Sequence, residues 1–134
     1  MTGEVKIIKY VNLGDAGKMI NPVQCRGQEE GAVVFGIGQA LFEELIYKDG
    51  KLANPNLVEY RLPKFRDLPM IFTSIILEEG GGSGPYGAKG MGEGGAVPVC
   101  AAICNAVYDA VGARIEEVPL KGERVWKVLD RRVR

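Results

Sequence analysis

The chain has 134 residues, 46% hydrophobic and 25% charged, and its 17 basic and 17 acidic side chains give a net charge of zero. These values are ordinary for a folded globular protein and exclude an intrinsically disordered chain. The zero net charge argues against nucleic-acid binding, because proteins that neutralise phosphates carry a basic excess. The sequence contains no histidine, which excludes catalytic triads and metal sites that depend on imidazole.

The cysteines and the hydropathy indicate the cellular compartment. The chain has three cysteines, an odd number, and they lack the paired spacing of a metal site: Cys25, Cys100 and Cys104. We therefore expect reduced thiols in a cytoplasmic protein. They are interpreted as buried small apolar residues, although Cys25 lies near enough to Gln28 to remain a candidate contact of the site below. No apolar run approaches the ~20 residues that span a bilayer, and we expect no membrane partner.

The first half of the chain predicts a strand followed by a long helix. Residues 4–13 are rich in β-branched and aromatic types, which favours a strand. Residues 22–46 predict a helix that begins at Asn21-Pro22, since asparagine caps a helix and proline fits its first turn. Its apolar residues recur at helical spacing: Val34, Ile37, Leu41 and Leu45.

Four glycines make this predicted helix unusual: Gly27, Gly31, Gly36 and Gly38. Each costs about 1 kcal/mol relative to alanine in an exposed helix interior. We therefore expect a bare face to which another backbone or a ligand comes close. Gln28 lies at the N-terminal end of that face.

The second half predicts further short elements. We expect a hairpin at 47–52 with an Asp-Gly turn, strands at 57–62, 70–78 and 114–118, and helices at 97–111 and 121–130. Gly112 is placed to end the helix at 97–111. Strands and helices do not alternate strictly, so the predicted class is α+β, a mixed small sheet with two main helices, about 22–46 and 97–111. Residues 1–134 are expected to form a single domain or part of one.

Nine of the chain's 19 glycines fall between Gly80 and Gly95, and this segment allows three interpretations. A flexible linker suits residues 80–84 best, but a chain this short has no room for two domains. A dinucleotide site is suggested by Gly90, Gly92 and Gly95, although that motif should follow a strand directly. The third interpretation is a catalytic or cofactor loop, in which glycines let backbone N–H groups approach a ligand.

Glu93 is the candidate catalytic residue of this segment. It stands among glycines just before the predicted helix, whose N-terminus favours an ionised carboxylate. Such a sterically open carboxylate suits a general base, but an acid at a helix start is also common for structural reasons alone. The residue pattern leaves these two alternatives open.

Longer motifs resemble one family. Residues 85–93 (PYGAKGMGE) and 101–114 (AAICNAVYDAVGAR) look like the C-terminal part of the molybdopterin-binding large subunits of molybdenum hydroxylases. That family includes xanthine dehydrogenase, aldehyde oxidoreductase and aerobic carbon monoxide dehydrogenase. Upstream, residues 27–31 (GQEEG), 35–44 (FGIGQALFEE) and 67–69 (DLP) are also similar, as are 118–120 (VPL). The resemblance covers nearly the whole chain.

The resemblance implies a function and a site. Family members hydroxylate an aldehyde, a purine-like heterocycle or a similar electron-poor carbon with a molybdenum-bound oxygen. Glu93 matches the family's active-site glutamate and Gln28 a glutamine that contacts the cofactor, while Lys89, Gly90 and Gly92 lie in the loop that lines the same site. The metal takes no protein ligand in this family. The implied cofactor is molybdopterin with molybdenum, in some members as the cytosine dinucleotide.

The resemblance also implies partners. Family large chains run to several hundred residues, so we expect a companion that supplies the remainder of the molybdenum subunit, together with iron–sulfur and flavin (FAD) subunits. The isolated chain is expected to be inactive and to associate with itself through an exposed core edge. The alternatives are a non-catalytic remnant or assembly module of the same family, and a nucleotide-binding module.

Overall fold

The computed structural model describes residues 2–133. Its regular elements, in chain order, are strand β1 (Lys9–Asp15), helix α1 (Pro22–Leu41), strands β2 (Tyr47–Lys48) and β3 (Lys51–Leu52), the 3-10 turn η1 (Phe65–Asp67), strand β4 (Ile71–Leu77), the 3-10 turns η2 (Pro85–Gly87) and η3 (Gly94–Ala96), and helices α2 (Val99–Val111) and α3 (Gly122–Val133). The α+β class is confirmed, with small sheets and three helices.

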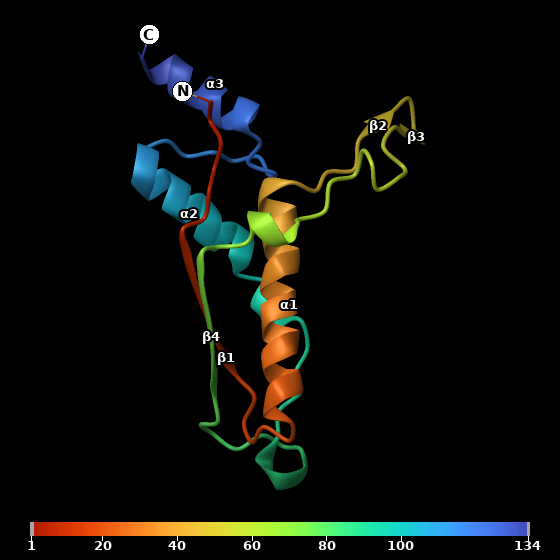
Figure 1. Cartoon of the computed structure of the whole chain (residues 1–134), viewed down its shortest axis with the longest axis vertical. Coiled ribbons are helices and arrows are strands. Elements are labelled where there is room, and N and C mark those ends of the chain that lie inside the picture. Colours follow the sequence, from red (N-terminus) through yellow and green to blue (C-terminus); the bar gives the residue numbers. More distant parts are fainter. Residues whose placement is uncertain (1, 134) are drawn as a thin grey trace.

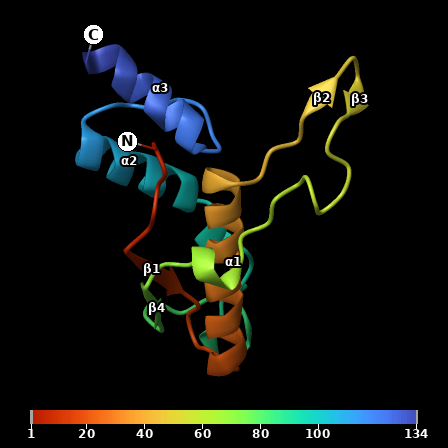
Figure 2. The same ribbon diagram turned by 45° about the horizontal axis from the view of Figure 1, so that its top comes forward.

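Helix α1 forms the long axis of the molecule (Figure 1). Strands β1 and β4 run beside it, α2 crosses near its C-terminal end, and α3 lies at that same end with both termini (Figure 1). The β2–β3 hairpin projects away from the rest of the chain, as the turned view also shows (Figure 2). The glycine-rich loop between β4 and α2 reaches the opposite end, where α1 begins.

β1 and β4 pair in parallel, from Lys9 opposite Ile71 to Asp15 opposite Leu77. One sheet face turns toward the core, where the rings of Tyr10 and Phe72 meet edge to face at 6.2 Å between centroids. The predicted strand at 70–78 is thus confirmed, whereas the strand predicted at 4–13 is displaced and begins only at residue 9.

Helix α1 begins where the sequence predicts and ends earlier. The Asn21 side chain accepts a hydrogen bond from the Gln24 amide at 3.1 Å, and Pro22 occupies the first turn. At the other end, the Gly38 carbonyl accepts from both Phe42 and Glu43, which closes the helix at residue 41 instead of 46. Leu45, predicted on the apolar stripe, is consequently exposed.

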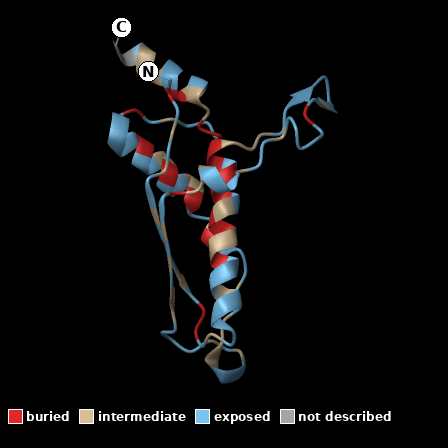
Figure 3. Cartoon of the chain, viewed as in Figure 1, coloured by how far each residue is buried: buried red, intermediate tan, exposed pale blue. Residues whose placement is uncertain are grey.

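The core lies where α1 crosses α2. Buried residues gather there, while the N-terminal half of α1 and most of the sheet are more exposed (Figure 3). Gly36 allows this crossing, because a Cβ at that position would lie 2.5 Å from Cγ2 of the fully buried Val99. The bare helix face expected from the glycines therefore serves backbone-to-side-chain packing at Gly36. At Gly27 and Gly31 it faces open space.

Three further predictions are confirmed and two are wrong. The 47–52 hairpin forms with Asp49 and Gly50 at positive φ, α2 ends at a left-handed Gly112, and the C-terminal helix forms. The strand predicted at 57–62 is absent, because Asn56 instead nucleates a turn by accepting from the following backbone amides. Residues 114–118 form no strand either.

Residues 94–111 have a mean hydropathy of 1.4, which by composition and length suits a membrane span. The structure divides this stretch into η3 and the 13-residue helix α2. At 1.5 Å per residue α2 is about 20 Å long, less than the ~30 Å of a bilayer core. Its buried side chains, Val99, Ile103 and Val107, belong to the core.

Candidate functional site

The first part of the glycine segment is a folded loop. The Gly82 amide donates to the Gly87 carbonyl at 2.8 Å, and the Gly84 amide to the Ala88 carbonyl at 3.1 Å. A Cβ at Gly82 or Gly84 would collide with the Ala88 carbonyl, so this backbone requires glycine. The loop therefore does not have the structure of a flexible linker. The dinucleotide motif also lacks its context, since β4 ends well before Gly90.

Lys89 is fixed to the end of β1. Its amide donates to the Ala16 carbonyl at 2.9 Å, and its ammonium forms an ion pair with Asp15. The hydrogen bond from Lys89, together with one from the Gly17 amide, lowers the pKa of Asp15. The positive charge expected in the loop is thus present but carries a carboxylate partner. Asp15, at the end of β1, thus belongs to the site through its ion pair with Lys89.

A hollow of about 580 Å³ opens between the start of α1 and this loop. Gln28 and Lys89 both line it, so the structure brings together two of the residues predicted to bind a cofactor. The full lining is Ala16, Lys18, Ile20, Asn21, Gln24, Cys25, Gln28, Ala88, Lys89 and Met91. Gly90 lies between two lining residues, and a Cβ there would meet open space.

Gln28 connects this hollow to Glu93. Its side-chain amide donates to the Gly92 carbonyl at 3.5 Å, a long hydrogen bond that links α1 to the residue directly before Glu93. Glu93 itself is exposed and lies outside the lining of the hollow. The five predicted site residues therefore lie along one continuous edge, formed by one turn of α1 and the segment 89–93.

The local backbone around Glu93 differs from the expectation. Glu93 precedes the 3-10 turn η3, in which the Ala96 amide donates to the Glu93 carbonyl at 3.0 Å. Helix α2 begins only at Val99. The N-terminus of α2 therefore does not stabilise the Glu93 carboxylate in the direct way that the sequence suggested, since the helix dipole acts mainly within the first turn.

A buried polar pair, which was not predicted from the sequence, lies beneath this edge. Glu29 is 6% exposed and Asn12 is 5% exposed, and the Asn12 amide donates to the Glu29 carboxylate at 2.5 Å. The burial of Glu29 could have been predicted from helical spacing, because Glu29 lies four residues before Val33 and eight before Ile37 on the buried stripe of α1.

The three cysteines are free and half-buried. Cys25 lines the hollow next to Gln28, as its position in the sequence suggested. Cys100 lies against α1, with its sulfur 3.8 Å from the Gly36 carbonyl, and burial raises the pKa of its thiol. Among the described residues, no cluster of cysteine and acidic side chains has the geometry to hold a metal ion.

Comparison with known proteins identifies the family. The sequence model of one protein family, the molybdopterin cofactor-binding domain, matches residues 1–69. The chain belongs to this family. This match includes the upstream motifs at 27–31, 35–44 and 67–69, and the relatives described next, which match over 90% of the chain, confirm the resemblance to the molybdenum-binding subunits of molybdenum hydroxylases.

Named relatives share most of this chain. The xanthine dehydrogenase molybdenum-binding subunit of Escherichia coli is 40% identical over 126 residues, which are 92% of this chain and 17% of that protein. The aldehyde oxidoreductase molybdenum-binding subunit PaoC of the same species is 37% identical over 132 residues, 97% of this chain and 18% of its own length. The crystal structure of quinoline 2-oxidoreductase from Pseudomonas putida superposes with a TM-score of 0.87 at 34% identity, covering 96% of this chain and 17% of that one. The chain thus spans less than a fifth of these relatives.

The residues along the edge fit a molybdopterin. This cofactor is anionic and presents many hydrogen-bonding groups, and the hollow offers the side-chain amides of Asn21, Gln24 and Gln28. It also offers the ammonium groups of Lys18 and Lys89, which pair with the carboxylates of Glu78 and Asp15. Gly90 and Gly92 leave the adjoining backbone uncovered, because a Cβ at either position would meet nothing within 4 Å. A large flat ligand can therefore approach the backbone there.

Proposed function

We propose that this chain forms one wall of the active site of a molybdenum hydroxylase, which hydroxylates an electron-poor carbon. The observation that supports the proposal is the hydrogen bond from Gln28 to the Gly92 carbonyl, because it joins the two family motifs directly before Glu93 in the chain. The substrate classes are aldehydes and purine-like or other nitrogen heterocycles. The names of the relatives, which include xanthine, aldehyde and quinoline, support this choice.

Four residues are proposed to hold the cofactor. The Gln28 amide binds it from α1, and Lys89 adds a positive charge whose position is fixed by Asp15. Gly90 and Gly92 give it access to the loop backbone, since neither carries a side chain and both border open space. The cytosine dinucleotide form of molybdopterin remains part of the proposal.

Glu93 is proposed as the general base. When bound, the molybdenum centre supplies the transferred oxygen and accepts the two electrons of the oxidation. Glu93 takes the proton from the oxygen nucleophile as it attacks the substrate carbon, which requires an open and ionised carboxylate next to the cofactor. Its exposed position among glycines meets the steric requirement.

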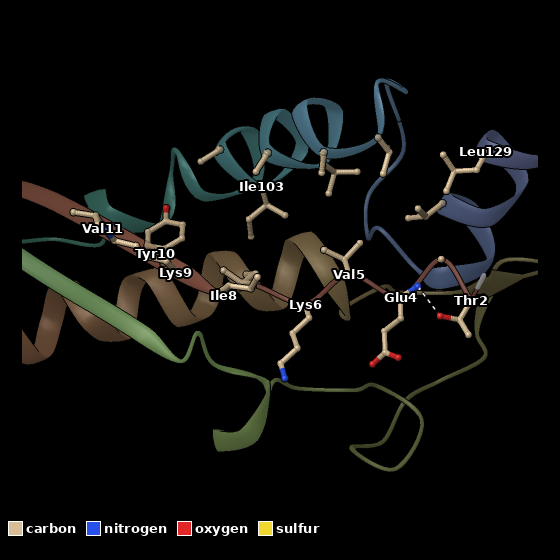
Figure 4. A pocket seen from close by; sticks show the side chains of 18 residues that line it. Thr2, Glu4, Val5, Lys6, Ile8, Lys9, Tyr10, Val11, Ile103 and Leu129 are labelled. Carbon is tan, nitrogen blue, oxygen red and sulfur yellow. Dashed lines mark hydrogen bonds between the residues drawn. The ribbon is translucent and has the colours of Figure 1, made fainter. Parts of the chain in front are cut away.

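Partner chains are also part of the proposal. The outer face of the parallel sheet exposes Val11, Leu13, Ile71 and Ile75, although parallel sheets are normally covered on both faces. A second hollow of about 890 Å³ lies between the N-terminal segment and helices α2 and α3, and apolar side chains such as Ile8 and Ile103 point toward it (Figure 4). We propose that the remainder of the molybdenum subunit covers these surfaces, and that iron–sulfur and flavin subunits in the cytoplasm carry the electrons away.

The test is Glu93→Gln in the enzyme assembled with its companion chains. The variant should keep its molybdenum content and lose about 100- to 10,000-fold in turnover, the usual contribution of general base catalysis. Glu116→Gln is the matched control, because Glu116 is also exposed but lies in the segment between α2 and α3. Full turnover by Glu93→Gln at normal molybdenum content would contradict the proposal.

A further inference from the structure

Glu29 is a buried acid that the proposed chemistry does not use. It follows Gln28 on α1, yet the two side chains lie in opposite environments: Gln28 is exposed at the hollow, and Glu29 is buried on the stripe that continues through Val33 and Ile37. Burying a carboxylate costs more free energy than burying an apolar side chain of similar size. An acid at this position therefore calls for a role that an apolar side chain would not fill.

The Glu29 carboxylate lies against two separate elements, β1 and η3. From β1, the Asn12 amide donates to it at 2.5 Å, and a Cβ on Gly14 would lie 3.1 Å from its Oε1 atom. From η3, a Cβ on Gly95 would lie 2.6 Å from Oε2. The carboxylate thus fills the space between β1 and η3, and a Cβ at either glycine would press against it, most closely at Gly95.

Contact with Gly95 extends to Glu93. Gly95 is buried, and the hydrogen bond from the Ala96 amide to the Glu93 carbonyl closes a turn that contains Gly95. A displacement of Gly95 must consequently shift Glu93. Since Glu29 and Gln28 are neighbours on one helix, the same turn of α1 contacts the loop twice: through Gln28 at Gly92 and through Glu29 at Gly95.

We propose that Glu29 is a positioning residue: its carboxylate, whose direction is fixed by the hydrogen bond from Asn12, packs against Gly95, holds η3 against α1 and thereby fixes Glu93 beside Gln28. The structural part of this inference stands on the contacts alone, and its catalytic consequence rests on the proposed function of Glu93. The hydrogen bond fixes the carboxylate in direction as well as place, which an apolar side chain cannot do.

The test compares three variants with the wild type in the assembled enzyme. Glu29→Met keeps the length of the side chain and removes the carboxylate. Asn12→Asp puts a second buried carboxylate against that of Glu29. The double variant Asn12→Asp/Glu29→Gln restores a hydrogen bond between an amide and a carboxylate, with the two groups exchanged. The control is Glu44→Gln at the opposite end of α1, which removes ion pairs to Lys121 and Arg124.

Hydrogen–deuterium exchange of the peptide 90–97 is the first measurement, because it reports the loop whether or not Glu93 is catalytic. Glu29→Met should speed exchange in this peptide about tenfold, and the double variant should exchange at nearly the wild-type rate. The second measurement is kcat against KM: kcat of Glu29→Met should fall up to about 100-fold, the cost of misplacing a reacting group by about 1 Å, while KM and molybdenum content stay unchanged.

The outcomes separate the two proposals. The positioning role is overturned if Glu29→Met leaves the exchange of peptide 90–97 unchanged. It is also overturned if Glu29→Met speeds exchange equally throughout the chain, which is the general loosening that we expect of Glu44→Gln. If the double variant does not restore the slow exchange of this peptide that Asn12→Asp loses, the positioning role is also refuted. If Glu93→Gln keeps full turnover while Glu29→Met still loosens the loop, the positioning role is supported and the proposed function is refuted. If Asn12→Asp does not fold, Glu29→Met and the double variant still test the positioning role of Glu29.

Discussion

The crossing of α1 and α2 predicts that one substitution has opposite effects at two positions of the same helix. In Gly36→Ala, the new Cβ would lie 2.5 Å from Cγ2 of Val99 and 3.0 Å from the Ala96 carbonyl oxygen. Val99 is 0% exposed and β-branched, so it has no free space and little rotamer freedom with which to avoid the contact. The two helices must separate, or Val99 must leave its rotamer.

The expected magnitude follows from two opposing terms. Overpacking a core costs about 1–3 kcal/mol, and alanine regains about 1 kcal/mol of helix propensity, so Gly36→Ala should lower the free energy of unfolding by up to about 2 kcal/mol. In Gly27→Ala, the new Cβ meets nothing within 4 Å. This variant gains only the propensity term and should be more stable than the wild type by up to about 1 kcal/mol.

Urea denaturation and thermal unfolding of the 134-residue chain, each followed by circular dichroism, measure both variants under the same conditions. The transition midpoints should move in opposite directions, and Tm should fall by roughly 5 °C for Gly36→Ala. If Gly36→Ala proves as stable as Gly27→Ala, the close packing of α1 on α2 would be refuted. An unchanged midpoint for both variants would refute the same reasoning.

Three further predictions concern charge and exposed surface. Replacing Lys89 with Met should raise the pKa of Asp15 toward its ordinary value, measured by NMR titration of the carboxyl carbon; an unchanged pKa would mean that their ion pair does not form in solution. Hydrogen bonds from two cationic side chains lower the pKa of Glu44 below its ordinary value of 4.5, so its contribution to stability is complete above about pH 5 and is lost as the pH falls through the lowered pKa. The unfolding free energy of Glu44→Gln should therefore fall less steeply on acidification than that of the wild type, and equal slopes would contradict the assignment. The purified chain should self-associate through its exposed sheet face, and the double variant Leu13→Glu/Ile75→Glu should remain monomeric in sedimentation experiments; equal association by both would place the contact elsewhere.

Local patterns predicted much of the fold. The cap formed by Asn21-Pro22, the Asp-Gly turn and Gly112 are signals that act within a few residues, and each occurs in the structure where expected. The end of α1 was not predictable in this way, because a composition typical of helices continues past residue 41 while the carbonyl of Gly38 closes the helix. The false strand at 57–62 has a similar origin, since its β-forming residues follow an asparagine that turns the chain.

The sequence suggests residues for the candidate site but not how they are arranged. The family motifs point to Gln28 and Glu93 as candidates, but the sequence does not show that the Gln28 amide reaches Gly92, the residue before Glu93, across 64 positions. Long-range pairs such as Lys89 with Asp15 and Asn12 with Glu29 depend on the parallel pairing of β1 with β4 and on its packing against α1. No local pattern encodes such contacts.

The most direct test of the central claim is the rate at which substrate reduces the molybdenum centre in a single turnover, because this step contains the proton transfer assigned to Glu93. Rapid mixing of an aldehyde or a nitrogen heterocycle with the fully loaded, assembled enzyme gives this rate for the wild type and for Glu93→Gln. We predict a reduction rate at least about 100-fold slower in the variant, at equal molybdenum content. Equal reduction rates would show that the carboxylate of Glu93 does not take the proton.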